Sequence, residues 1–82
     1  MATKDISDRQ VLEAYVEKER RYKAGEPKFY VDALLEQMTG QPNKVCYRAM
    51  ERAFHHGLLD YGVWLRGAWL TDAGKALLDT KI

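Results

Sequence analysis

The spacing of apolar residues predicts three helices followed by an extended segment. The first helix is predicted to begin after Ser7, because Ser7-x-x-Gln10 has the form of a capping box in which the Ser7 N-cap and Gln10 satisfy each other's backbone N–H groups. Ile6 before the cap is placed to pack on the first turn, whereas we expect residues 1–6 as a whole to be loose. Gly25 ends this helix at about Ala24. Its apolar face consists of Val11, Leu12, Tyr15, Val16 and Tyr22.

A second, shorter helix is predicted to end at Gly40, because glycine adopts the left-handed conformation of a helix C-terminus without steric cost. Its apolar face consists of Val31, Leu34, Leu35 and Met38. The aromatic run Lys28–Tyr30 before it is a candidate edge strand.

The third predicted helix covers residues 41–56, between Gly40 and Gly57. Pro42 suits its first position, where a backbone N–H has no partner within the helix. We expect the apolar face to bury Cys46, Met50 and Phe54, with Ala53 between them. The opposite side is polar and consists of Asn43, Lys44, Tyr47, Arg48, Glu51, Arg52 and His55.

After Gly57 the pattern changes to that of a β-hairpin with Arg66-Gly67 as its turn. A two-residue turn there pairs Trp64 with Trp69. The partners on either side of this pair are Val63 with Leu70 and Leu65 with Ala68. Val63, Leu65, Ala68 and Leu70 then share the face predicted to contact the core, and the two tryptophans lie on the opposite face. Thr71 is placed to cap a last helix from Asp72 to Leu78.

Composition limits the class of protein. The 82 residues are enough for one small domain, and 46% of them are hydrophobic, which suffices for a globular core. The sequence has no run of 18 or more apolar residues, so we expect no membrane span. The first ten residues lack an apolar signal segment, so we expect a cytoplasmic protein. The net charge is only +1, although Lys44, Arg48 and Arg52 outnumber Glu51 on the third helix.

The sequence offers little for catalysis, a metal ion or a cofactor. His55 and His56 are adjacent, so on a helix they point about 100° apart and cannot chelate one metal ion. Cys46 is expected to be a small core residue, with a reactive thiol as the alternative. No nucleophile–base pair or glycine-rich phosphate loop is recognisable, so we do not expect an enzyme.

Two motifs carry a resemblance to a known family. The first lies around the third helix and consists of Thr39-Gly40, Cys46, Arg48-Ala49-Met50, Ala53 and Gly57-Leu58-Leu59. The second is the run Trp69–Leu78, which closes the hairpin. Together they resemble the winged helix-turn-helix regulators of the MarR and PadR type. The resemblance implies a mainly α fold with a small β-hairpin, in the order helix, strand, helix, turn, helix, β-wing and short helix, as one domain over residues 1–82. Cys46 and Ala53 replace larger aliphatic residues of the family pattern. The family's long dimerisation helices have no counterpart in this sequence.

This resemblance implies a small bacterial or phage transcriptional regulator that binds double-stranded DNA through the helix 41–56 and a wing at residues 60–71. A recognition helix enters the major groove by its N-terminal half, where Asn or Gln suits adenine, Arg suits guanine and Lys suits phosphate. The candidate DNA-binding residues are Gln41, Asn43, Lys44, Tyr47, Arg48, Arg52 and, at the wing tip, Arg66.

The alternative function is a winged-helix module that binds another protein or a second copy of itself. The near-neutral charge favours it, as does the Trp64/Trp69 pair, which the predicted register leaves exposed. Burial of both tryptophans against the first helix is the structural alternative to such an interface.

Overall fold

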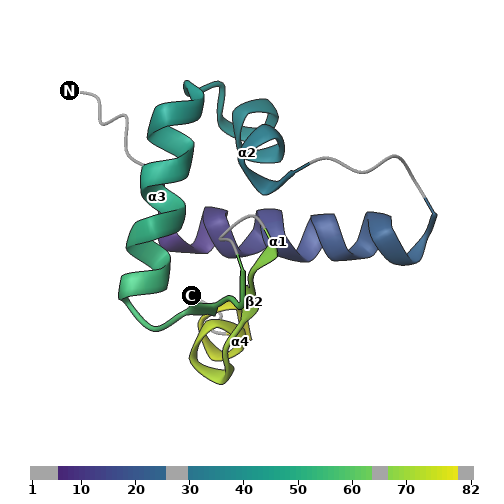
Figure 1. Ribbon diagram of the computed structural model, residues 1–82, viewed down its shortest axis with the longest axis vertical. Helices are drawn as coiled ribbons and strands as arrows, with labels where there is room; N and C mark the ends of the chain where they lie inside the picture. Colours follow the sequence, from purple (N-terminus) through teal and green to yellow (C-terminus); the bar gives the residue numbers. More distant parts are fainter. Residues whose placement is uncertain (1–5, 26–29, 64–66, 80–82) are drawn as a thin grey trace.

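The computed structural model describes residues 6–25, 30–63 and 67–79. Within these residues the chain forms four helices and a small antiparallel sheet near the C-terminus (Figure 1). The elements are α1 (Asp8–Lys23), α2 (Val31–Thr39), α3 (Asn43–His55), β1 (Leu59–Asp60), β2 (Trp69–Leu70) and α4 (Asp72–Asp79). None of the helices in the described residues is long and apolar enough to cross a membrane.

The start of α1 confirms the predicted capping box. The Gln10 backbone N–H donates to Ser7 Oγ at 3.1 Å, and the Ser7 N–H donates to Gln10 Oε1 at 2.9 Å. Ala24 is the C-cap, as expected. Residue 6 does not belong to a loose terminus, because Ile6 is only 2% exposed. An apolar residue just before an N-cap packs on the first turn of the helix, and here Ile6 joins the core.

The connection between α2 and α3 is short and sharply bent. Gly40 ends α2 with φ of +74°, and its N–H donates to the Glu36 carbonyl. Pro42 is the N-cap of α3 rather than its first helical residue, so the helix starts at Asn43 and ends at His55. Tyr30 is the N-cap of α2 and belongs to no strand, while the rest of the candidate strand lies outside the described residues.

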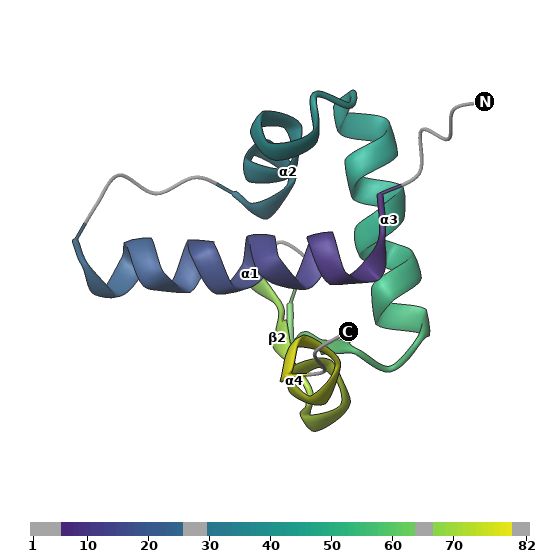
Figure 2. The same cartoon turned by 180° about the vertical axis from the view of Figure 1, so that it is seen from behind.

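The core lies where α1, α2 and α3 pack against one another. The views from both sides show α2 on one side of α1 and the hairpin with α4 on the other, with α3 crossing α1 near its N-terminal end (Figures 1 and 2). Cys46 and Met50 are buried in it as predicted. Phe54 is only half-buried, with its ring 4.9 Å from that of Tyr61, because it lies at the rim of the contact between α3 and the sheet. Met38 is 47% exposed, contrary to the prediction, since the short α2 buries only the face that contacts α1 and α3.

The hairpin has a different register from the predicted one. Leu59 pairs with Leu70, where the prediction had Val63, and the strand partner of Trp69 is Asp60. Val63 is 92% exposed and contributes nothing to the core. The physical reason is that Leu59, two residues after the Gly57 helix stop, is the residue that reaches the core. The two strands are consequently short, and a longer connection than a two-residue turn joins them. Trp64, Leu65 and Arg66 lie outside the described residues.

The last helix is fixed at both ends by hydrogen bonds. Thr71 Oγ accepts the Gly74 N–H at 3.2 Å, which confirms its predicted capping role, and its hydroxyl donates to the Gly57 carbonyl at 2.6 Å. At the other end, the Arg9 guanidinium donates to the carbonyls of Leu77 and Leu78 at 3.1 and 3.2 Å. These bonds hold α4 against both α1 and the start of the sheet.

Candidate functional site

The outer face of α3 consists of the exposed residues Lys44, Arg48, Glu51 and His55. Their spacing of four, three and four residues places them in one row on the side of the helix opposite Cys46 and Met50. Neither Lys44 nor Arg48 has a hydrogen-bond or ion-pair partner among the described residues. Both cations are therefore available to a ligand.

Two further candidate DNA-binding residues flank this outer face. Gln41 is half-buried in the connection before α3. Tyr47 is half-buried and packs against the core. Burial raises the pKa of the Tyr15 hydroxyl, with smaller contributions from Tyr47 and Asp32. Tyr47 thus presents only part of its side chain to the surface.

Arg52 is held by a group of residues that we call the Asp8 clamp, made of Asp8, Arg52 and His56. Arg52 Nε donates to Asp8 Oδ1 at 3.0 Å, and His56 Nδ1 donates to Asp8 Oδ2 at 2.7 Å. The Arg52 guanidinium also donates to the Ile6 carbonyl. Burial alone raises the pKa of the Asp8 carboxyl, but the bonds from His56 and Arg52 outweigh it and hold this pKa below its usual value. In this geometry the clamp fastens the start of α1 to the end of α3.

Asn43 is also engaged within the protein. Its Nδ2 group donates to Asp32 Oδ2 and to Glu36 Oε2, each at 2.9 Å. Asp32 is 3% exposed and lies in the first turn of α2, where its Oδ1 accepts the Ala33 N–H. We call Asp32, Glu36 and Asn43 the elbow triad, because they join α2 to α3.

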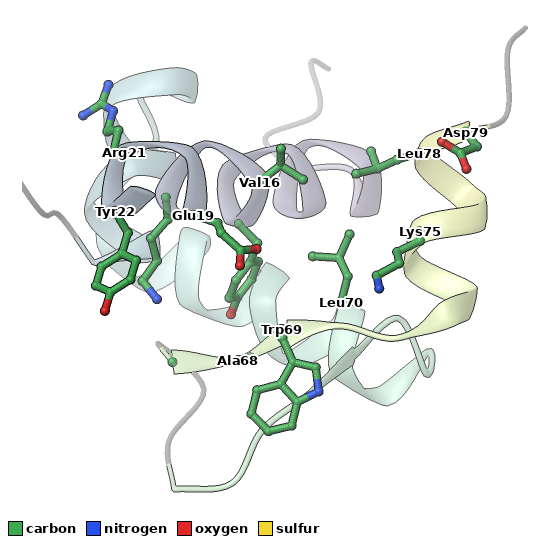
Figure 3. A pocket seen from close by; sticks show the side chains of 13 residues that line it. Val16, Glu19, Arg21, Tyr22, Ala68, Trp69, Leu70, Lys75, Leu78 and Asp79 are labelled. Atoms are coloured by element: carbon green, nitrogen blue, oxygen red, sulfur yellow. The ribbon is translucent and has the colours of Figure 1, made fainter. Parts of the chain in front are cut away.

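A groove of about 700 Å³ lies between α1, β2 and α4 (Figure 3). Trp69 is 53% exposed at its edge, and Val16 and Tyr22 of α1 are exposed in its wall. These two residues were expected to be on the buried face of the first helix. They stay exposed because α1 extends past α2 and α3, so nothing in the described residues covers that part of it. Trp69 is thus not buried against α1, while Trp64 and Arg66 lie outside the described residues.

The described residues contain no group of three or more His, Cys, Asp or Glu side chains that could hold a metal ion. Cys46 is buried, and its Sγ lies 3.6 Å from the Gln41 carbonyl. Burial raises the pKa of the thiol, which disfavours the reactive thiolate. The observed burial agrees with the interpretation of Cys46 as a core residue.

The sequence pattern did not identify Asp8, Asp32 or Glu36 as partners of the polar face of α3. Asp8 and Arg52 are far apart in the chain, and no local spacing relates them. The one available signal was weak. Asp8 and Asp32 each stand in the first turn of a helix, where an acidic residue is already favoured by the helix dipole and needs no other explanation.

The class that this fold defines is a small, mainly α domain with four helices and an antiparallel β-hairpin near the C-terminus, in the residues that the structure describes. Comparison with known proteins finds no matching family model, no matching curated protein and no matching solved structure.

Proposed function

We propose that this protein binds double-stranded DNA as a winged helix-turn-helix regulator, with α3 in the major groove and the hairpin beside it. The observation that carries the proposal is the pair Lys44 and Arg48 on the outer face of α3. Both residues are exposed and lie one turn apart on α3, and neither has a hydrogen-bond or ion-pair partner among the described residues. Free cations on a protruding helix are what phosphate and guanine contacts require.

The short bent connection between α2 and α3 supports the same proposal. A helix-turn-helix needs two helices joined by a few residues, with the second helix free on its outer side. Here Gly40, Gln41 and Pro42 form the connection, and α2 covers only the inner side of α3 (Figure 1). The residues best placed to contact DNA are then Gln41, Lys44, Tyr47 and Arg48.

Arg52 has a different role in this proposal from the phosphate contact expected from the sequence. Its guanidinium is committed to Asp8 and to the Ile6 carbonyl. Its contribution to binding is therefore indirect, because it holds α3 in position on α1.

The proposal is tested by fluorescence anisotropy on fragments that the purified protein selects from genomic DNA. Binding that releases counterions gives log K a slope of about −0.9 per phosphate contact against log salt concentration. We expect Lys44→Ala to weaken binding to all sequences and to flatten this slope by about one contact. Arg48→Ala is expected to cost about 1–3 kcal/mol on the selected sequence and less on random DNA.

Lys23→Ala is the matched control. Lys23 is an exposed cation in the last turn of α1, at the end farthest from α3 (Figure 1). The control removes the same charge and should change affinity little. Equal effects of Lys23→Ala and Lys44→Ala, or wild-type binding that does not respond to salt, would refute the proposed role of α3.

A second candidate function is self-association through the groove, favoured by three exposed apolar residues that line it, Val16, Tyr22 and Trp69. A two-fold dimer places one surface against its own copy, so that surface should carry both charge signs. The rim of the groove does so, with Lys18 and Lys75 against Glu19 and Asp79. Sedimentation of the wild type and of Trp69→Ala tests this self-association, which the substitution should weaken. A wild-type monomer at all accessible concentrations excludes the dimer.

A further inference from the structure

The elbow triad fixes the orientation of the Asn43 amide. A primary amide has two N–H donors, and both are accepted here, one by Asp32 Oδ2 and one by Glu36 Oε2. Ionised carboxylates only accept hydrogen bonds, so the amide cannot turn its oxygen toward them. Asn43 Oδ1 therefore points away from both acidic side chains.

This orientation determines what Asn43 offers to a ligand. Asn43 is the first residue of α3 and is exposed, and Glu36 is exposed in the last turns of α2. Around the start of α3 the surface thus presents the Asn43 Oδ1 and the Glu36 carboxylate. Both are acceptors, and no N–H of the Asn43 side chain is left over.

We propose that Asn43 and Glu36 together select a cytosine in the bound DNA. This inference rests on the proposed DNA-binding function and adds its sequence preference. It replaces the adenine contact that an Asn at this position suggests from sequence alone, because bidentate pairing with adenine needs a donor as well as an acceptor from the same amide.

The preference for cytosine follows from the hydrogen-bonding groups that each of the four bases presents in the major groove. Guanine presents two acceptors and thymine presents one, so both place lone pairs against the acceptors of the elbow triad. Adenine presents a donor at N6 but also an acceptor at N7 beside it, and this acceptor finds no donor from Asn43 or Glu36. Cytosine presents its N4 amino donor without a neighbouring acceptor. It is the base that offers this surface a donor and sets no acceptor of its own against the oxygens of Asn43 and Glu36.

Buried Asp32 positions the other two members of the triad. Its carboxylate is fixed by the Ala33 N–H and holds one Asn43 N–H at 2.9 Å. Because Asp32 is inaccessible, it contacts no base itself. Glu36 is the member that can be changed without disturbing the core, so it is the better position for a test.

The test measures base preference at every position of the selected DNA site for wild type, Asn43→Ala, Glu36→Gln and Lys44→Ala. Wild type should prefer cytosine at one position by about fivefold or more. Asn43→Ala should reduce this preference to about twofold or less. Glu36→Gln should shift it toward adenine, because the new amide supplies a donor for N7 beside the Asn43 oxygen. Lys44→Ala, the control, should weaken binding and leave the preference unchanged.

A second measurement examines the triad without DNA. The two side-chain N–H signals of Asn43 in a ¹⁵N NMR spectrum should shift in Glu36→Gln, and backbone signals of the core should not. Unchanged side-chain signals overturn the fixed orientation. If wild type binds DNA with a steep salt dependence but shows no cytosine preference that responds to Asn43 or Glu36, the inference is wrong and the proposed function stands. If wild type binds no DNA, both fail.

Discussion

The Asp8 clamp allows a sharp prediction about stability. Asp8→Asn removes the negative charge but keeps the size of the side chain. In the native protein the two carboxylate oxygens serve different partners, Arg52 Nε at 3.0 Å and His56 Nδ1 at 2.7 Å. An amide has one oxygen, so it cannot accept hydrogen bonds from both partners, and the bond from Arg52 loses its charged acceptor.

The expected size follows from the exposure of the partners. The Asp8 side chain is 22% exposed, but Arg52 and His56 are 36% and 54% exposed, so water screens much of the attraction. Hydrogen bonds of this kind contribute about 0.5–1.5 kcal/mol each. We therefore expect Asp8→Asn to lower the free energy of unfolding by about 1–2 kcal/mol at pH 7.

The loss should depend on pH with a definite sign. The folded-state pKa of Asp8 is held below its usual value of 3.8, so the folded protein favours the ionised form. The contribution of Asp8 is therefore fully present above pH 3.8 and is lost as the pH falls through the lower folded-state value. The difference between wild type and Asp8→Asn should shrink toward zero in that acidic range.

Urea denaturation at pH 7, 5 and 3 measures this difference. With a slope of about 1 kcal/mol per molar urea, the midpoint should fall by about 1–2 M at pH 7 and pH 5 and by less at pH 3. Glu51→Gln is the control, since it removes an exposed carboxylate from the outer face of α3 and should change the midpoint little. Equal midpoints for Asp8→Asn and wild type at pH 7 would contradict the reasoning.

Three further substitutions test the packing, each measured by urea denaturation. Met50→Ala should cost about 2–4 kcal/mol, because the side chain is fully buried and its removal leaves a cavity. Gly74→Ala should cost about 1–3 kcal/mol, because an added Cβ would overlap the backbone carbonyl oxygen of Leu58. Trp69→Ala should cost about 1–2 kcal/mol in the monomer, since about half of the residue is already in water, and a loss of about 3–5 kcal/mol would place the ring in the monomer's core.

Much of the helical part of the fold was predictable because its signals are local. The Ser7–Gln10 capping box and the Gly40 stop each act within a few residues, and both are present where expected. Cys46 and Met50 were assigned to the core by their spacing of four residues alone. Such patterns depend only on helix geometry, which the sequence displays directly.

The hairpin register was not predictable in this way. Arg66-Gly67 is a good two-residue turn, and the segment before it is rich in strand-forming residues, so local propensity favoured pairing Val63 with Leu70. The observed pair is Leu59 with Leu70. Leu59 forms the pair because it lies a few residues after the end of α3, whose packing places it in the core, and this tertiary effect outweighs β-propensity.

The candidate site was predictable only as a set of positions. The polar face of α3 was correctly distinguished from its buried face, but the sequence could not tell which side chains have partners within the protein. Arg52 and Asn43 are both committed, through contacts with Asp8, Asp32 and Glu36 from other helices. Lys44 and Arg48 have no such contact among the described residues, and this difference arises from how the helices pack rather than from any local pattern.

The two candidate surfaces use separate parts of the molecule, and this makes their functions independently testable. Among the described residues the groove is lined by α1, β2, α4 and the residues just before β2, and no residue of α3 belongs to it. Lys44 and Arg48 can therefore be removed without touching the groove, and Trp69 without touching the outer face of α3. A protein that both binds DNA and dimerises would lose one property in each variant and keep the other. If Trp69→Ala abolished association and also weakened DNA binding, the dimer would be the DNA-binding form, because joining two recognition helices raises affinity without any new contact by either.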